Sequence, residues 1–409
     1  MAGIVPRHLI YTAAHGGFAQ QKAPLGGGGA VCDHLLQAWK RLQPFDSIAC
    51  VTPQSVTGKE LVGYSESQYA RFCREFERYS TSEVLKRDPR DTAVLVNDIS
   101  EGPDFRKLAE RGFRVFTIYH VDVVAYVADI YAKGLISPRG LARAYEYLHW
   151  AVPDMAKLVF EKQKHSVLYS QKCIVPSQRV KDVLRGCYPQ RPDDFVEVIP
   201  WGSIADSTAV APDTAALREE YNVTSPVILT LSRISPEKGQ DQLLAALRDY
   251  PDPLTVFICG DPAFMQGQAH MAKLRKLASQ VPPHVKVRFP GHVTGDRKLA
   301  FFALADLYVF PSRHESYGLT LMEALAAGLP AVCLDHAGAS EILHDDFGRI
   351  VRAEDLAGTI RTLLRDEPLR CRMSTAGKQF AAAHPFEQAA TRIAELILTC
   401  GVPDSPATG

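Results

Sequence analysis

The chain has 409 residues, 46% of them hydrophobic, which is enough to bury two sizeable cores. Lys plus Arg equals Asp plus Glu at 46 each, so the charge gives no indication of a nucleic-acid-binding protein. Nine singly scattered cysteines argue against a disulfide framework or a zinc site. With no basic and apolar leader in Met1–Pro6 and no long apolar run, we expect a cytoplasmic protein, and a peripheral membrane contact stays open.

Short apolar runs alternate with helix-like stretches in the N-terminal half of the chain. The predicted strands are His8–Thr12, Ile48–Val51, Ala93–Val96, Val115–Tyr119, Cys173–Val175 and Val196–Ile199. Helical patterns between them include Ala30–Arg41 and Leu141–Lys162. This β-α alternation is typical of a doubly wound, Rossmann-like domain with a parallel sheet.

A further helical stretch, Gln68–Arg90, combines many charges with aromatic residues at helical spacing. Tyr69, Phe72 and Phe76 form an apolar stripe. We interpret the stripe as a core-facing surface, with a membrane-binding helix as the alternative.

Small and polar residues from Ser203 to Pro212 predict a linker, so we place the domain boundary near residue 204. Residues 1–203 then form the first domain and residues 204–385 the second. A final helix and tail, residues 386–409, follow His384-Pro385 and could pack on either domain, including back on the first.

The strand pattern restarts in the C-terminal half. The predicted strands are Val227–Leu231, Leu254–Cys259, Val285–Phe289, Leu307–Phe310 and Ala331–Leu334. Helical stretches separate them, which predicts a second Rossmann-like domain. In such sheets ligands bind beyond the carboxyl ends of the strands, so we look for functional residues directly after these runs.

Two carboxylates, Glu315 and Glu323, follow the strand Leu307–Phe310. Good helix formers from Leu319 to Ala327 stop at Gly328, which predicts a helix that begins near Gly318. A helix start presents unpaired N–H groups and a partial positive charge to an anion. Eight helical residues span about 12 Å, whereas the carboxyls of a glycosidase lie about 5–9.5 Å apart. The pair therefore fits the two ends of one extended ligand better than a hydrolase.

Two cations, Arg233 and Lys238, follow the strand Val227–Leu231. Ser235 and Pro236 fit the N-cap and first position of the next helix, so Lys238 falls in a first turn that the helix dipole makes unfavourable for a cation. Such a broken local rule indicates function. The two side chains could neutralise a departing phosphate, or they could be ordinary surface cations, one of them paired with Glu237.

Taken together, these residues resemble the retaining nucleotide-sugar glycosyltransferases of GT-B fold that are called group 1 or family four. The resemblance rests on Arg233…Lys238-Gly239, Gly260-Asp261, Gly291-His292-Val293 and Glu315-x7-Glu323 followed by Gly328-x-Pro330. It implies two Rossmann-like domains that face across a cleft. The first would bind an acceptor and the second a nucleotide sugar. Trp201 departs from the asparagine that is commoner in the family.

The resemblance implies a role for each matched residue. Arg233 and Lys238 would hold and stabilise the leaving diphosphate, Glu315 would face the donor sugar and Glu323 the ribose. The remaining donor-binding positions that it implies are Gly260, His292, Val293, Ser316, Tyr317, Gly318 and Leu319. Asp261 could equally be a helix cap.

In the N-terminal half, His120 follows the strand Val115–Tyr119 and matches the histidine of the family that binds a sugar hydroxyl. A core histidine is the alternative. The glycine run Gly26–Gly29, with Gly28 and Gly29 as donor-binding positions, fits a loop that a ligand approaches closely, although simple flexibility would also explain it.

The implied reaction is the transfer of a hexose, with retention, from a UDP-, GDP- or ADP-sugar to a glycan, a lipid-linked or a small-molecule acceptor. Glycan biosynthesis in the cytoplasm would be its setting, with association with a membrane as the open alternative. We expect no metal, because Asp-x-Asp is absent and the two cations can replace it, and no cofactor. The alternatives are a sugar-nucleotide epimerase or another GT-B enzyme, and a catalytically silent binding protein. Donor base, acceptor and oligomeric state stay undetermined.

Overall fold

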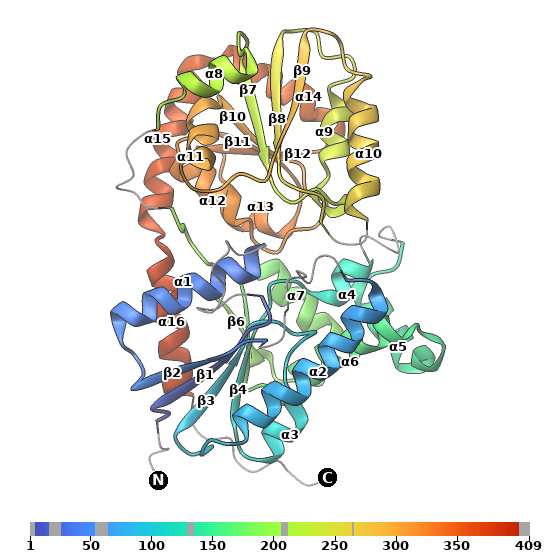
Figure 1. Ribbon diagram of the computed structural model, residues 1–409, viewed down its shortest axis with the longest axis vertical. Helices are drawn as coiled ribbons and strands as arrows, with labels where there is room; N and C mark the ends of the chain where they lie inside the picture. Colours follow the sequence, from blue (N-terminus) through green and yellow to red (C-terminus); the bar gives the residue numbers. More distant parts are fainter. Residues whose placement is uncertain are drawn as a thin grey trace. The chain divides into compact units, whose positions relative to one another are not determined.

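The computed structural model divides the chain into two compact units (Figure 1). Unit 1 consists of Met1–Trp201 and Phe386–Gly409, and unit 2 of Gly202–Pro385. The structure describes residues 5–15, 26–53, 64–128, 135–205, 212–263 and 266–400. Most of the predicted linker lies outside these ranges. No helix within them combines the length and the apolar composition needed to cross a bilayer.

Unit 1 contains a parallel six-stranded sheet in the order β2-β1-β3-β4-β5-β6. Its strands are β1 (His8–Thr12), β2 (Ser47–Val51), β3 (Thr92–Val96), β4 (Arg114–Ile118), β5 (Lys172–Val175) and β6 (Val196–Val198). The strand order reverses between β1 and β3, and such a switch point is where doubly wound sheets bind ligands.

The helices of unit 1 alternate with these strands along the chain, and the last one comes from the C-terminal segment. They are α1 (Gly27–Leu42), α2 (Glu66–Val84), α3 (Phe105–Glu110), α4 (Val123–Tyr126), α5 (Pro138–Leu148), α6 (Asp154–Tyr169), α7 (Gln178–Cys187) and α16 (Phe386–Thr399), with 3₁₀ turns η3 (His149–Ala151) and η4 (Asp193–Phe195). On α2, Phe72 and Phe76 are buried with Tyr69 packed beside them, so the aromatic stripe does face the core.

Two local predictions in unit 1 were wrong. The predicted helix Leu141–Lys162 is interrupted: α5 ends at Leu148 and α6 begins at Asp154, directly after Pro153. Proline lacks the N–H that a helix interior needs, and it disfavours helical geometry at the residue before it. The glycine run is not a loop, because Gly26 is the N-cap of α1 (φ 111°) and Gly27–Gly29 form its first turn.

Unit 2 contains a second parallel six-stranded sheet, in the order β12-β11-β10-β7-β8-β9. Its strands are β7 (Val227–Leu231), β8 (Leu254–Cys259), β9 (Val285–Gly291), β10 (Leu307–Phe310), β11 (Ala331–Leu334) and β12 (Gly348–Val351). β7, β8, β10 and β11 coincide with the predicted strands, whereas the edge strand β12, which contains Gly348 and Arg349, was not predicted. The two sheets confirm a pair of doubly wound α/β domains.

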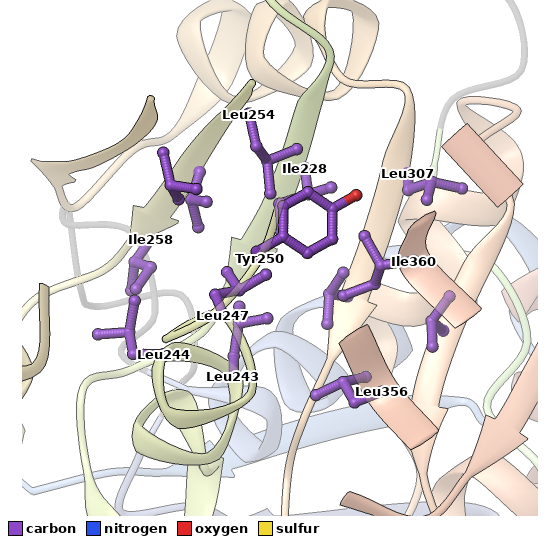
Figure 2. Packing of buried hydrophobic residues seen from close by; sticks show 14 of the residues in the cluster. Ile228, Leu243, Leu244, Leu247, Tyr250, Leu254, Ile258, Leu307, Leu356 and Ile360 are labelled. Atoms are coloured by element: carbon purple, nitrogen blue, oxygen red, sulfur yellow. The ribbon is translucent and has the colours of Figure 1, made fainter. Parts of the chain in front are cut away.

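Helices lie on both faces of the second sheet (Figure 1). They are α8 (Ala215–Tyr221), α9 (Gln240–Ala246), α10 (Gly267–Ala278), α11 (Gly295–Leu304), α12 (Leu319–Ala326), α13 (Ala337–Ile342), α14 (Leu356–Arg365) and α15 (Glu367–Ala383), with 3₁₀ turns η5 (Pro236–Lys238) and η6 (Ala353–Asp355). Figure 2 shows one core of this unit, where Leu243 and Leu244 of α9 and Ile360 of α14 pack on Ile228 and Leu307 of the central strands. This apolar packing holds the strand ends, and the loops that leave them, in fixed positions.

Candidate active site

The predicted phosphate and sugar residues of unit 2 meet at the switch point of its sheet. The order of strands reverses between β7 and β10, which are direct neighbours. Arg233 and Lys238 lie on the segment after β7, and Glu315 lies on the segment after β10. The sheet topology thus brings together cations and a carboxylate that are almost eighty residues apart in the chain.

Lys238 and Glu315 are bonded to each other. The Lys238 ammonium donates to Oε2 of Glu315 at 2.5 Å, and both side chains are largely buried, with 12% and 18% exposed. Burial alone would raise the pKa of Glu315, but the charge of Lys238 and the hydrogen bond that it donates outweigh burial and leave that pKa below its ordinary value. Glu315 is therefore an ionised acceptor that can receive hydrogen bonds from hydroxyl groups.

Lys238 reaches this position from a 3₁₀ turn and not from the predicted first turn of an α-helix. η5 ends at Lys238, Gly239 follows in the left-handed conformation (φ 65°), and only then does α9 begin. Ser235 makes no cap; its hydroxyl donates to Glu237 at 2.6 Å instead. The argument from the helix dipole at Lys238 was wrong, although the side chain lies where that argument placed a functional cation.

Arg233 lies near Glu237, as the surface-cation alternative predicted for one of the two cations. Its side chain is 29% exposed, and Nη2 lies 3.9 Å from Oε1 of the buried Glu237. The distance of this pair is longer than that of a hydrogen bond.

The helix start after Glu315 has the predicted form. α12 begins at Leu319 with Gly318 as its N-cap at φ 114°, and a Cβ on Gly318 would lie 2.9 Å from the ring of Phe310. Ser316 and Tyr317 are buried beside it. The Tyr317 hydroxyl accepts a hydrogen bond from the Gly202 N–H at 2.8 Å. This hydrogen bond ties the Tyr317 side chain to the backbone at Gly202.

Glu323 lies one turn further along α12 and is 9% exposed. Lys298 of α11 donates to its Oε1 at 2.6 Å. Lys298 was missed by the sequence analysis, because no local spacing connects α11 with α12. The contact of Glu323 with the ribose stays a prediction.

The segments after β8 and β9 are bonded to one another. Gly260 adopts φ 144°, and its N–H donates to the Gly291 carbonyl at 2.8 Å. Asp261 is not a helix cap, because its Oδ1 accepts from the His292 N–H at 3.1 Å. His292 is exposed, whereas Val293 is buried. Asp261 therefore shapes the turn at which a nucleotide base was predicted to pack.

Sequence analysis also missed the contacts that hold the segment of Glu315 against the elements that follow β7. Arg313 forms a bidentate ion pair with Asp241 of α9, at 2.7 and 2.9 Å, and its backbone N–H donates to the Glu237 carbonyl at 2.8 Å. Burial would raise the pKa of Asp241, but hydrogen bonds from Arg313 and Lys273 lower it to about 2. The ion pair and the backbone hydrogen bond of Arg313 together fix the segments after β7 and β10 relative to each other.

In unit 1, His120 lies at the end of β4 in a tight environment. Its Nε2 faces Oδ1 of Asn97 at 3.1 Å, which requires the proton on Nε2, and its ring packs on Trp201 with centroids 6.0 Å apart. Loss of hydration and the charge of His15 lower the pKa of His120 to about 3. His120 is therefore a neutral hydrogen-bonding group near pH 7, and its predicted role in sugar binding stays a prediction.

Close packing accounts for the glycine at position 28 of the glycine run. A Cβ on Gly28 would lie 3.0 Å from Cδ2 of His120, so a glycine lets α1 approach the imidazole. Gly29 is buried in the same turn. Gly28 thus lies against the histidine, and a direct contact of Gly28 or Gly29 with the donor stays a prediction.

A polar cluster that was not predicted lies at the switch point of the first sheet. Oε1 of Glu101 receives hydrogen bonds from His15 (2.9 Å) and from the Tyr69 hydroxyl, and Glu101 is only 3% exposed. Burial opposes ionisation of Glu101, but His15 and Tyr69 leave its pKa below the ordinary value. Asp98 accepts from the Ala14 and His15 N–H groups, which joins the ends of β1 and β3.

Two doubly wound parallel domains in one chain define the GT-B class of fold. Solved structures share this fold over nearly the whole chain. Alr3699/HepE from Anabaena, solved with UDP and glucose, has a TM-score of 0.67 at 18% identity and covers 96% of this chain and 100% of its own. Sucrose-phosphate synthase from Thermosynechococcus elongatus has a TM-score of 0.69 at 17% identity, with 95% and 98% covered.

Residues 214–380 match the family "Glycosyl transferases group 1". A GDP-mannose-dependent alpha-(1-6)-phosphatidylinositol monomannoside mannosyltransferase of Mycobacterium tuberculosis is 32% identical over 225 residues, 50% of this chain and 56% of that protein. A D-inositol 3-phosphate glycosyltransferase of Corynebacterium aurimucosum is 29% identical over 232 residues, 53% and 54% of the two chains. The chain spans about half the length of the curated relatives it matches. Most of unit 2 is thus similar to the group 1 glycosyl transferases, and the whole chain shares the GT-B fold.

Proposed function

We propose that this protein is a glycosyltransferase that moves a hexose from a nucleoside-diphosphate sugar to an acceptor hydroxyl with retention of anomeric configuration. The single observation that carries the proposal is the Lys238–Glu315 contact at the β7/β10 switch point, with Arg233 beside it and the α12 helix start adjoining. Cations that face a phosphate and a carboxylate that faces a sugar are the two recognition elements that such a donor needs.

In the proposed donor complex, the diphosphate takes over the Lys238 ammonium and the Arg233 guanidinium. Glu315 then accepts hydrogen bonds from the hydroxyls of the sugar, and Glu323 from those of the ribose. As the bond between the anomeric carbon and the phosphate oxygen breaks, negative charge grows on the diphosphate, where the two cations stabilise it. The acceptor hydroxyl attacks from the same face, and its proton passes to the departing phosphate.

The same groups favour a nucleoside-diphosphate sugar as the donor, but they do not identify the base of its nucleoside. Relatives with GDP-mannose in their names and a fold neighbour solved with UDP and glucose make both nucleotides the first candidates. The acceptor could be a glycan, a lipid-linked or a small-molecule hydroxyl, because relatives act on phosphatidylinositol mannoside and on inositol phosphate. We expect catalysis without a divalent metal and a place in cytoplasmic glycan biosynthesis.

The test begins with thermal shifts of the full chain against UDP-, GDP- and ADP-sugars, since a ligand that binds the folded state raises its unfolding temperature. With the donor identified, transfer is measured with and without a chelator, and NMR of the product gives the anomeric configuration. Inversion would disprove the mechanism, and loss of activity with chelator would disprove metal independence. An isomerised donor without transfer would indicate an epimerase, and binding without turnover a silent protein.

The site assignment is tested with Lys238→Met. We expect kcat to fall on the order of a hundredfold or more, because one stabilising donor to the transition-state charge is lost. The matched control is Arg297→Met, which breaks the exposed ion pair with Glu220 in the same unit and should leave kcat within about twofold. Circular dichroism verifies that both variants are folded. Unchanged kcat in a folded Lys238→Met variant would contradict the assignment.

A further inference from the structure

The outer face of α5 and the turn η3 carry an exposed aromatic and basic stripe. Arg139, Arg143 and Tyr147 are spaced four residues apart, and Trp150 follows three residues later, so they share one face as far as the helical geometry extends. Tyr147 is 80% exposed and Trp150 77%. Leu148 beside them is 53% exposed. Tryptophan and tyrosine rarely expose so much surface in a group without a partner.

The opposite face of α5 is firmly packed. Tyr145 is buried, its ring stacks on Phe160 of α6 with centroids 4.8 Å apart, and its hydroxyl donates to Glu161 at 2.9 Å. Leu141 and Ala142 join the same cluster. In Figure 1, α5 lies at the margin of unit 1. The stripe is therefore displayed by a fixed helix and is not a side effect of a loosely attached one.

The charges around the stripe leave it positive. Among the described residues, Arg139 and Arg143 form no ion pair. Glu146, the acidic residue nearest in the helix, is neutralised by Lys164, which contacts both of its carboxylate oxygens at 2.8 and 3.0 Å. An acidic surface would complement this stripe. A second copy related by a twofold axis would instead place these arginines near their own equivalents.

We propose that the α5–η3 stripe docks the protein on an anionic lipid surface. The arginines would contact lipid phosphates, and Trp150 and Tyr147, apolar rings with one polar group each, would lie at the level of the headgroups, where these side chains are most stable. α2, the other amphipathic candidate, buries its aromatic residues Phe72 and Phe76 in the core and has no such surface. Docking is independent of the proposed transfer reaction, because it is measured without donor or acceptor.

The full chain is sedimented with vesicles of phosphatidylcholine alone and of phosphatidylcholine with phosphatidylserine. We expect binding to the anionic vesicles only, weakened by salt, since mobile ions screen surface charges. Arg139→Gln/Arg143→Gln and Tyr147→Ser/Trp150→Ser should each lower the affinity by roughly tenfold or more. The control is Arg275→Gln/Arg372→Gln, which removes two exposed arginines of unit 2 and should bind as the wild type does.

Tryptophan fluorescence gives a second measurement. The chain has three tryptophans; Trp39 and Trp201 are buried at 1% and 2% exposed, so Trp150 is the one that lipid can reach. Brominated lipid in the vesicles should quench the emission of wild type but not that of Trp150→Leu. Equal binding to both vesicle types, wild-type affinity of the stripe variants, or no quenching would overturn the proposal. Loss of binding only in a variant of exposed α2 residues, such as Arg78→Gln, would assign docking to that helix instead.

Discussion

His336 illustrates how the environment of one residue sets its chemistry. It is 2% exposed, and its Nδ1 accepts the Ala339 N–H at 3.0 Å, which caps α13. The proton must then lie on Nε2, which has no hydrogen-bond partner among the described residues. Burial, which outweighs the attraction of Glu315, lowers the pKa of His336 to about 4. A neutral histidine is therefore built into the back of the candidate site.

This pKa makes unit 2 sensitive to acid. An unfolded histidine binds a proton below its ordinary pKa of 6.5, whereas the folded His336 does so only near 4, so acid favours the unfolded state between these values. Near pH 5 the loss in free energy of unfolding amounts to about 2 kcal/mol. His336→Asn keeps a side-chain oxygen for the cap but does not titrate, so it should lose about 2 kcal/mol less than wild type between pH 7 and pH 5.

Urea unfolding followed by circular dichroism at the two pH values measures this difference. His292→Asn, which alters an exposed histidine of the same unit, is the control. Equal losses in the wild type and in His336→Asn would show that protonation of His336 does not contribute.

At the scale of elements, the ends of the strands are shaped by close backbone contacts. Gly260, after β8, adopts φ 144°, and a Cβ there would lie 1.8 Å from the Ser232 carbonyl oxygen on the segment after β7. No side chain fits. Because Gly260 has no Cβ, the segment that carries Arg233 can pack directly against the Gly260 backbone.

The same substitution should have opposite effects at two glycines of unit 2. Gly260→Ala should cost roughly 1–3 kcal/mol of stability, and it should weaken donor binding because the Ser232–Arg233 backbone must move. Gly358→Ala, within α14, meets nothing within 4 Å and should stabilise by about 0.5–1 kcal/mol. Thermal unfolding measures both changes. A neutral Gly260→Ala variant would contradict the tight packing seen here.

At the scale of the whole molecule, the last helix of the chain, α16, belongs to unit 1, whose other elements all precede unit 2 in the sequence. α16 follows unit 2 along the chain but packs on α1: Trp39 donates its Nε1–H to the Ala390 carbonyl at 2.8 Å, and Ile393 is completely buried. The first and last residues of unit 2 lie side by side, since the Ser203 N–H donates a hydrogen bond to the His384 carbonyl at 2.7 Å.

Ile393→Ala should destabilise unit 1 by about 2–5 kcal/mol, because it removes buried methyl groups and leaves a cavity. Trp39, Trp150 and Trp201 all belong to unit 1, so tryptophan fluorescence follows the unfolding of this unit alone. Glu395→Ala, at an exposed position of the same helix, should change stability by less than about 0.5 kcal/mol. An Ile393→Ala variant as stable as this control would show that α16 is dispensable.

The sequence by itself determined the two doubly wound sheets and the positions of Arg233, Lys238, Glu315 and Glu323. Buried parallel strands are short apolar runs between turns, and such sheets present the residues that follow their strands, so both are readable locally. Pro153 and the Gly26–Gly29 run were misjudged, because the break and the cap depend on the exact register of one turn.

Only the tertiary structure decided the partners: Lys298 for Glu323, Asp241 for Arg313, and Asn97 for His120. These contacts join elements that are distant in the chain, and no sequence spacing encodes them. The protonation states of Glu315 and His336 depend on burial and on neighbouring charges, which exist only once the chain has folded. The sequence thus supplied the groups of the candidate site, and packing around the strand ends decided what each of them touches and whether it carries a proton.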